Sequence, residues 1–275
     1  MRFDWYQATI HENPIVIVET LKTALAPDGQ VKEGRGRHNY WQSFKILDKA
    51  GDKVAEVLAG GPNGDPNAVS SGHAAEPFSK VVRGAWPVHR VTRFDAAEDL
   101  IHQDAMTRLE GVCRALAADL KIKGRAVVPD DPKDGKTYYL GAPSSDTRVR
   151  LYDKTAETRL KLPPERHSEI PENWARLEIQ VRPRNDFREL AAMSTPENAW
   201  GFSGWTAELA KRAFSLDIPR VTMQAGRETD HQRAYRFMLK QYGAVLKQML
   251  DDLGSWDCVG LTIGADIRKL DREKR

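Results

Sequence analysis

The sequence has little of what marks secreted, membrane-spanning or cysteine-rich metal-binding proteins. Its 275 residues include two cysteines, Cys113 and Cys258, too few for a disulfide framework or a cysteine-rich zinc site. No stretch approaches the roughly 18 consecutive apolar residues of a membrane-spanning helix. Residues 1–14 also lack the apolar core of a signal peptide. We therefore expect a cytoplasmic protein without a membrane partner.

A strong excess of one sign of charge is also missing. The chain has 42 lysines and arginines against 39 aspartates and glutamates, a formal net charge of +3. This excludes a histone-like chain but permits a nucleic-acid partner. With 40% hydrophobic and 29% charged residues, the composition is that of a globular protein of one large domain or two small ones.

The hydrophobic pattern predicts two similar halves, each made of a strand, a helix and a hairpin. The ranges are 2–10, 14–25 and 40–59 in the first half, and in the second a strand centred on Phe94, then 97–120 and 136–152. A strand at 174–182 and a helix after Asn185 follow. We expect an α+β fold in which both halves share a mostly antiparallel sheet.

The remaining segments are predicted as loops and C-terminal helices. Residues 26–39, 60–72 and 127–135 are rich in glycine, proline or charge and are expected to be loops. From about Pro196 the apolar spacing becomes helical. This predicts a catalytic domain over 1–195 and a helical extension over 196–275 that packs on it.

Three separated segments contain the residues best suited to chemistry. In chain order they are Thr92-Arg93-Phe94-Asp95, then Tyr139-Leu140-Gly141 followed by Arg150-Leu151-Tyr152-Asp153-Lys154, and finally Arg176-Leu177-Glu178. Their order and spacing resemble the motifs T-R-x-D, Y-x-G, R-x-Y-[DN]-K and R-x-E of the trans-acting rolling-circle replication initiators of plasmids and filamentous phages. The resemblance spans roughly residues 1–195.

The resemblance implies a metal-dependent DNA strand-nicking and joining endonuclease in a bacterial host cell. Such an enzyme cuts one strand of an origin, presented as a single strand or a cruciform, and forms a 5′-phosphotyrosine link. The freed 3′-OH primes rolling-circle replication by the host helicase and polymerase. By similarity, Tyr152 is the nucleophile, and Asp95 and Glu178 hold Mg²⁺ or Mn²⁺.

The residue types around Tyr152 fit this chemistry. Strand alternation places Arg148, Arg150 and Tyr152 on one face. A phenol with a pKa of about 10 is a weak nucleophile at neutral pH, and nearby guanidiniums favour its phenolate and hold a phosphate. Lys154 is two residues further on, where its charge could stabilise the leaving oxygen. We therefore expect Arg150 and Lys154 to assist Tyr152, and Arg148 to contact DNA.

Each of these residues also has a structural alternative. Tyr152 is equally typical of a half-buried strand tyrosine, and Asp95 could form an ion pair with Arg93. Glu178 could lie on a solvated strand face. Asp99 is expected in the first turn of a helix, where a carboxylate suits the helix dipole.

The segment 29–41 offers further DNA contacts. Arg35 and Arg37 precede Tyr40 and Trp41, and cations followed by aromatic rings suit phosphate contact together with base stacking. A solvated charged loop explains these four residues equally well.

Two competing functions and one mechanistic question stay open at this point. A conjugative relaxase of related fold would make the same cut at a transfer origin, and a non-catalytic DNA-binding regulator would bind without cutting. A single nucleophile must cut and later rejoin, which calls for either a homodimer or a second tyrosine. Tyr138 and Tyr139 are the candidates for the second tyrosine, with strand packing as their alternative role.

Overall fold

The computed structural model of the chain describes residues 1–222 and 230–273. They belong to two compact units, Met1–Met223 and Gln224–Arg275, and each unit is described by itself. The first unit contains every strand that the structure describes, and with them the candidate site.

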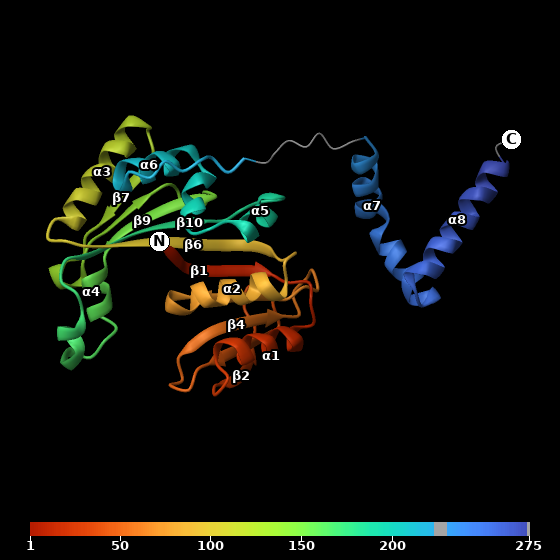
Figure 1. The fold of residues 1–275 in the computed structure, drawn as a ribbon, viewed down its shortest axis with the longest axis horizontal. Coiled ribbons are helices and arrows are strands. Elements are labelled where there is room, and N and C mark those ends of the chain that lie inside the picture. Colours follow the sequence, from red (N-terminus) through yellow and green to blue (C-terminus); the bar gives the residue numbers. More distant parts are fainter. Residues whose placement is uncertain (223–229, 274–275) are drawn as a thin grey trace. The chain divides into compact units, whose positions relative to one another are not determined.

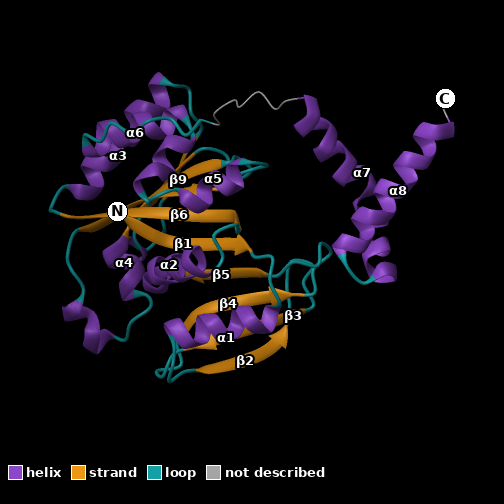
Figure 2. Cartoon of the chain, turned by 45° about the vertical axis from the view of Figure 1, so that its right-hand side comes forward, coloured by secondary structure: helices purple, strands orange, loops and turns teal. Residues whose placement is uncertain are grey.

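The first unit is built on one ten-stranded antiparallel sheet (Figures 1 and 2). The strand order is β2-β3-β4-β5-β1-β6-β10-β9-β8-β7. The strands are β1 Arg2–Thr9, β2 Gln30–Arg35, β3 Gln42–Leu47, β4 Lys53–Ala59, β5 Asn67–Ser71, β6 Arg90–Ile101, β7 Gly124–Val127, β8 Thr137–Leu140, β9 Thr147–Asp153 and β10 Trp174–Val181.

Six α-helices accompany the sheet in the described part of this unit. They are α1 Pro14–Leu25, α2 Ala75–Ala85, α3 Ala105–Asp119, α4 Lys154–Arg159, α5 Phe187–Met193 and α6 Gly204–Phe214. Helix α1 starts where the sequence predicts, because Pro14 occupies the first turn and the Asn13 side chain accepts the N–H of Ile15 at 2.9 Å.

The predicted two-half organisation is confirmed. Strands β1 and β6 pair at the centre, and the strands outward from them correspond in order: β5, β4, β3 and β2 on one side, and β10, β9, β8 and β7 on the other. Each half runs strand, helix, four strands, helix, and the second half adds α4 between β9 and β10. The fold class is α+β, as predicted.

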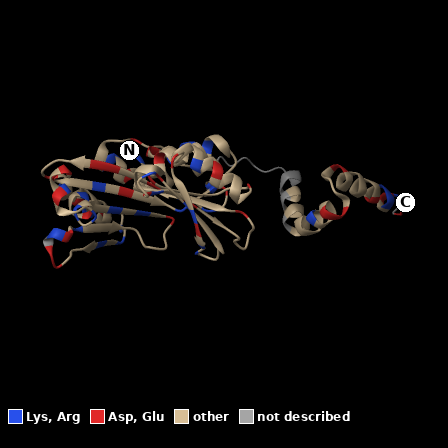
Figure 3. Ribbon diagram, turned by 90° about the horizontal axis from the view of Figure 1, so that it is seen from below, with Lys and Arg blue, Asp and Glu red and all other residues tan. Residues whose placement is uncertain are grey.

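One hydrophobic core lies between the helices and one face of the sheet. Phe78 of α2 stacks edge-on against Tyr6 of β1 at 6.2 Å between ring centroids. In the second half, Phe202 stacks on Phe94 of β6 at 5.3 Å, and Phe94 also meets Phe3 at 5.9 Å. These contacts join both halves into one core. The opposite face is left for polar residues, and Figure 3 shows acidic and basic positions along the strands.

Two strands, β2 and β5, lie where the sequence predicted loops, and a third, β7, lies mostly within residues 121–126, for which no element was predicted. β2 and β7 are the two edges of the sheet, and their residues are mostly exposed. Neither strand has the apolar alternation that identifies a strand from sequence. β5 follows a glycine- and proline-rich turn and buries small polar side chains instead, as when Ser70 donates to the Val54 carbonyl at 2.6 Å. The loop predictions at β2 and β5 were wrong.

Strand β6 is longer than predicted and α3 starts later. The helix expected over 97–120 begins at Ala105, and residues 97–101 continue the strand. Asp99 is therefore a strand residue, and the expectation that it begins a helix was wrong. Its carboxylate is bound by Arg176 of β10, a partner so distant in the sequence that no local pattern reveals it.

Strand β1 contains a bulge that changes which side chains reach the polar face. Phe3 and Trp5 pair with consecutive residues of β6, so Asp4 is the extra residue. Strict alternation along this strand would place Phe3 and Trp5 on one face and Asp4 and Tyr6 on the other. Instead, Phe3 lies in the core together with Tyr6, whereas Asp4 and Trp5 both face the polar side.

The residues after 195 divide between the two units. The 3₁₀ helix Glu197–Phe202 and α6 belong to the first unit, where Trp200 is fully buried in the core. The second unit contains α7 Asp230–Leu253 and α8 Trp256–Glu273, which contact each other. Gly254, at φ 77°, follows the end of α7. Among the described residues, no helix is both long and apolar enough to cross a membrane.

Candidate active site

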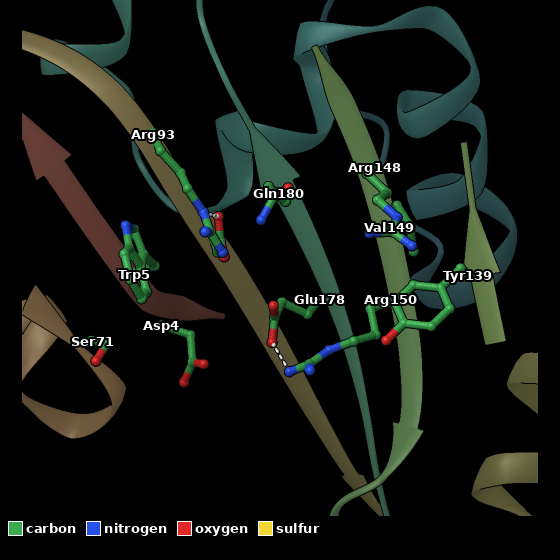
Figure 4. A pocket seen from close by; sticks show the side chains of 11 residues that line it. Asp4, Trp5, Ser71, Arg93, Tyr139, Arg148, Val149, Arg150, Glu178 and Gln180 are labelled. Atoms are coloured by element: carbon green, nitrogen blue, oxygen red, sulfur yellow. Dashed lines mark hydrogen bonds and ion pairs between the residues drawn. The ribbon is translucent and has the colours of Figure 1, made fainter. Parts of the chain in front are cut away.

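A pocket of about 330 Å³ lies on the polar face where the two halves of the sheet meet (Figure 4). Its walls come from β1, β6, β8, β9 and β10, with the end of β5. The lining residues are Asp4, Trp5, Ser71, Arg93, Asp95, Tyr139, Arg148, Val149, Arg150, Glu178 and Gln180. Both signs of charge and two aromatic rings therefore meet in one depression.

The register of the strands explains why these side chains meet. One row across the sheet consists of Tyr139, Arg150 and Glu178. The next row consists of Arg148, Gln180, Asp95, Trp5 and Ser71. Directly paired residues on neighbouring strands have Cβ atoms about 5 Å apart, so the members of a row touch. The predicted alternation along β9 is confirmed, and β10 alternates in the same way, since the residues between these positions are in the core.

Both carboxylates that the sequence assigned to a metal line this pocket, and both are held by arginine. Asp95 accepts from Arg93 at 3.0 and 2.5 Å, and Glu178 accepts from Arg150 at 3.1 Å. Burial raises the pKa of Asp95 despite Arg93. Burial, helped by repulsion from Asp95 and Asp4, raises the pKa of Glu178 to about 7 although Arg150 opposes it. In this arrangement burial therefore disfavours the ionised forms of both carboxylates.

Two arginines in the pocket retain unused hydrogen-bond donors. The Nε–H groups of Arg148 and Arg150 are buried and have no partner. Each guanidinium lies over an aromatic ring, Arg148 at 4.1 Å from the Tyr139 centroid and Arg150 at 4.0 Å from that of Tyr152. Stacking fixes the planes of both guanidiniums. Their free N–H groups are therefore available to an anion such as a phosphate.

A buried ion-pair network joins the two halves beside the pocket. Arg176 of β10 binds Asp99 of β6 through two nitrogens, at 2.7 and 3.0 Å, and Asp4 of β1 at 2.9 Å. Arg2 and the indole of Trp174 also donate to Asp99, each at 2.8 Å. This network binds the bulged residue Asp4 in place and connects three strands.

Tyr152 lies on the polar face but does not line the pocket. It is 4% exposed, and Arg150 covers its ring. Burial is the main cause that raises the pKa of its hydroxyl, and the charge of Glu178 adds to the effect. Arg150 and Arg176 act in the opposite direction without cancelling it. In this arrangement the phenolate of Tyr152 is disfavoured.

Lys154 lies beside Tyr152 at the start of α4. Its ammonium is 5.6 Å from the Tyr152 ring centroid and forms an ion pair with Glu157 at 2.5 Å. Burial lowers the pKa of Lys154, with Glu157 opposing. Asp153 caps α4, since its side chain accepts the N–H of Ala156 at 2.9 Å. Lys154 is thus close to Tyr152 but does not line the pocket.

The four candidate DNA-binding residues of segment 29–41 lie in the first half and do not line the pocket. Arg35 and Trp41 are exposed, Trp41 at 80%. Arg37 donates to the buried Glu56 at 2.8 Å, and Tyr40 is partly buried, which raises the pKa of its hydroxyl. Arg35 and Trp41 are therefore free to contact a ligand, whereas Arg37 is already engaged.

The donor atoms of the pocket suit a hard divalent cation. Asp4, Asp95 and Glu178 offer carboxylate oxygens on one face, and Mg²⁺ and Mn²⁺ prefer such ligands. In the part of the chain that the structure describes, no three His, Cys, Asp or Glu side chains already form a ligand set. Glu178 accepts from Arg150 through Oε2 alone, which leaves Oε1 for a cation, whereas both oxygens of Asp95 accept from Arg93.

Sequence reasoning assigned no role to Trp5, Ser71 or Gln180, which also form the pocket. Gln180 is hydrogen-bonded to Asp95. The guanidinium of Arg93 lies over the Trp5 ring, 4.3 Å from the ring centroid. The alternation of β10 placed Gln180 on the same face as Glu178, a signal that could have identified it. Trp5 could not be identified, because its orientation depends on the bulge at Asp4.

Comparison with known proteins gives similarity in fold to solved structures. No family model and no curated protein matches the chain. Among solved structures, a rolling circle replication initiator protein from Geobacillus stearothermophilus is similar, with a TM-score of 0.50 and 21% sequence identity. The match covers 70% of this chain and 76% of that one. At this identity the likeness concerns the fold.

Proposed function

We propose that this chain is a replication initiator that nicks one strand of an origin DNA by tyrosine transesterification and frees a 3′-OH for rolling-circle replication. The observation that carries the proposal is the pocket, where arginines, carboxylates and a tyrosine meet on the strands that bear the ordered motifs. The similarity in fold to a solved initiator supports it.

Arg148 and Arg150 are the proposed phosphate-binding residues. Both have a buried Nε–H without a partner and a guanidinium stacked on a ring. Phosphate oxygens accept short, strong hydrogen bonds from guanidinium groups. A scissile phosphate held there would lie beside Glu178, the ion-pair partner of Arg150.

Asp95 and Glu178 are the proposed ligands of Mg²⁺ or Mn²⁺, which would act as a Lewis acid on the scissile phosphate. The chain's own arginines would balance the negative charge of the phosphate and orient it. The motif designates Tyr152 as the nucleophile, with Lys154 beside its ring. Exposed Arg35 and Trp41 are proposed to contact the DNA outside the pocket.

The two competing functions differ from this proposal in what they do to DNA. A non-catalytic regulator on the same scaffold would bind DNA and leave it intact. A conjugative relaxase would make the same cut, so it differs only in its DNA target. The carboxylates held beside unpartnered arginine N–H groups favour a catalytic protein over a regulator, since a binding surface for DNA has no need of acidic groups in its centre.

The test is a nicking assay on the supercoiled replicon that encodes the protein, with Mg²⁺ or Mn²⁺ and with a chelator. We expect relaxed circles with the metal and none with the chelator. Asp95→Asn and Glu178→Gln should lose nicking while still binding DNA. Glu110→Gln removes a buried, ion-paired carboxylate of α3 outside the pocket and should nick normally. DNA that stays intact with wild-type protein would contradict the proposal.

A further inference from the structure

The ammonium of Lys154 lies beside two aromatic rings instead of extending into water. It is 5.6 Å from the ring centroid of Tyr152 and 5.9 Å from that of Trp174. The Lys154 side chain is 14% exposed. A lysine has a flexible four-carbon stem, and burial of its ammonium is unfavourable unless an anion compensates it. The place that this ammonium occupies therefore calls for a partner.

Glu157 is that partner, one turn further along α4. Its Oε2 atom accepts from the Lys154 ammonium at 2.5 Å, and its Oε1 atom forms an ion pair with Lys161. Glu157 is three residues after Lys154 and four before Lys161, a spacing that brings side chains together on a helical turn. Among the described residues, no other carboxylate forms an ion pair with Lys154. Glu157 is thus the anion that compensates the buried ammonium.

The backbone around Lys154 is fixed independently of Glu157. The side chain of Asp153 caps α4. The Thr155 hydroxyl accepts the backbone N–H of Trp174 on β10 at 3.0 Å, which ties the start of the helix to the sheet. Only the side-chain torsions of Lys154 therefore remain to be set, and the hydrogen bond to Glu157 sets them.

We infer that Glu157 is a positioning residue, which holds the Lys154 ammonium beside Tyr152 for the cutting of the DNA strand. The inference rests on the proposed function and deepens it, because it says how Lys154 is kept in place. The motif ends at Lys154, so sequence reasoning gave Glu157 no role.

From this position Lys154 supplies a proton to the leaving group. The Tyr152 oxygen gives its proton to solvent and forms a bond to phosphorus. The bond between phosphorus and the 3′ oxygen of the DNA breaks, and that oxygen leaves with the electron pair. The Lys154 ammonium gives it a proton and later regains one from solvent. The products are a 5′-phosphotyrosine and a 3′-OH. Without Glu157 the ammonium would turn to solvent, away from the leaving oxygen.

The charge of Glu157 also helps to keep Lys154 protonated. Burial lowers the pKa of Lys154, and Arg176 and Lys161 lower it further, whereas Glu157 raises it. The titratable group of β9 beside the ammonium is Tyr152, whose pKa is raised by burial, so it stays neutral. Glu157→Gln keeps the shape of the side chain and removes its charge, which should lower the pKa of Lys154 by about one unit.

The first test is a double-mutant cycle of nicking rates on the supercoiled replicon with Mg²⁺. We expect Lys154→Met to slow nicking about 100-fold, the lower end for loss of a general acid, and Glu157→Gln to slow it about tenfold. The double variant should nick at the rate of Lys154→Met, because Glu157 acts through Lys154. The control Glu169→Gln removes a carboxylate from an exposed pair with Arg166 and should nick like wild type.

The second test follows Lys154 without DNA. Acetic anhydride acetylates the neutral amine, so the pH dependence of acetylation, read by peptide mass spectrometry, gives the pKa of Lys154. We expect a lower pKa in Glu157→Gln and no change in Glu169→Gln. A double variant slower than Lys154→Met, or an unchanged pKa in Glu157→Gln, would overturn the inference and leave the proposed function standing. Wild-type protein that leaves the replicon intact would overturn both.

Discussion

The ion-pair network beside the pocket is expected to contribute strongly to stability. Arg176 is 3% exposed and donates three hydrogen bonds to the carboxylates of Asp99 and Asp4. Asp99→Asn keeps the shape of the side chain and removes its charge, leaving the buried guanidinium with Asp4 as its remaining carboxylate partner. Removing one partner of a buried ion pair costs about 3–5 kcal/mol. Because the Asp99 side chain keeps 19% of its exposure, we expect the lower end, about 3 kcal/mol.

The assay is urea unfolding of wild type and variant at neutral pH, repeated in acid. Arg176, Arg2 and Trp174 lower the pKa of Asp99 against the effect of burial. Its ionised form therefore stabilises the fold above the unfolded value of about 3.9, and this contribution is lost as the pH falls through the lower folded value. The difference between wild type and variant should shrink there. Glu172→Gln, at an exposed ion pair, should change stability by less than about 1 kcal/mol. The reasoning is refuted if both variants behave alike.

Three further predictions concern binding and the core. In fluorescence titrations, Arg148→Gln should weaken single-stranded DNA binding and reduce the magnitude of the slope of log K against log salt by about 0.7, the value for one phosphate contact on a single strand. The control Arg166→Gln, on the exposed surface, should leave this slope unchanged. Trp200→Ala removes a fully buried indole and should cost about 3–5 kcal/mol in urea unfolding. Burial lowers the pKa of His89, so its neutral form stabilises the fold above about pH 6.5. Below that pH the free energy of unfolding should fall more for wild type than for His89→Gln. An equal fall in both proteins would contradict this.

The sequence predicted correctly those strands that have one apolar and one polar face, because their side chains alternate along the chain. Alternation along β9 and β10 placed Arg148, Arg150 and Glu178 on a common polar face, and the structure confirms this. The repeated strand, helix and hairpin predicted a sheet shared by two halves. These features are local, since each depends on the spacing of apolar residues in one segment.

The remaining features depend on contacts between distant segments. The edge strands β2 and β7 are held by hydrogen bonds to a neighbour and bury little, so their own residues do not identify them. The bulge at Asp4 arises from pairing with β6. That Arg150 covers Tyr152 while Tyr139 stays open is likewise a property of packed strands. Motif order alone designates Tyr152 and cannot show its burial.

The most direct test of the central claim is the state of the two DNA ends after the cut. The nicked replicon is isolated under denaturing conditions, and each end is examined enzymatically. We expect a 3′-OH that a polymerase extends at once, and a 5′ end that resists phosphatase and kinase until the attached protein is digested to a tyrosine-linked peptide. Two free ends, or protein joined to the 3′ end, would contradict nicking by tyrosine transesterification.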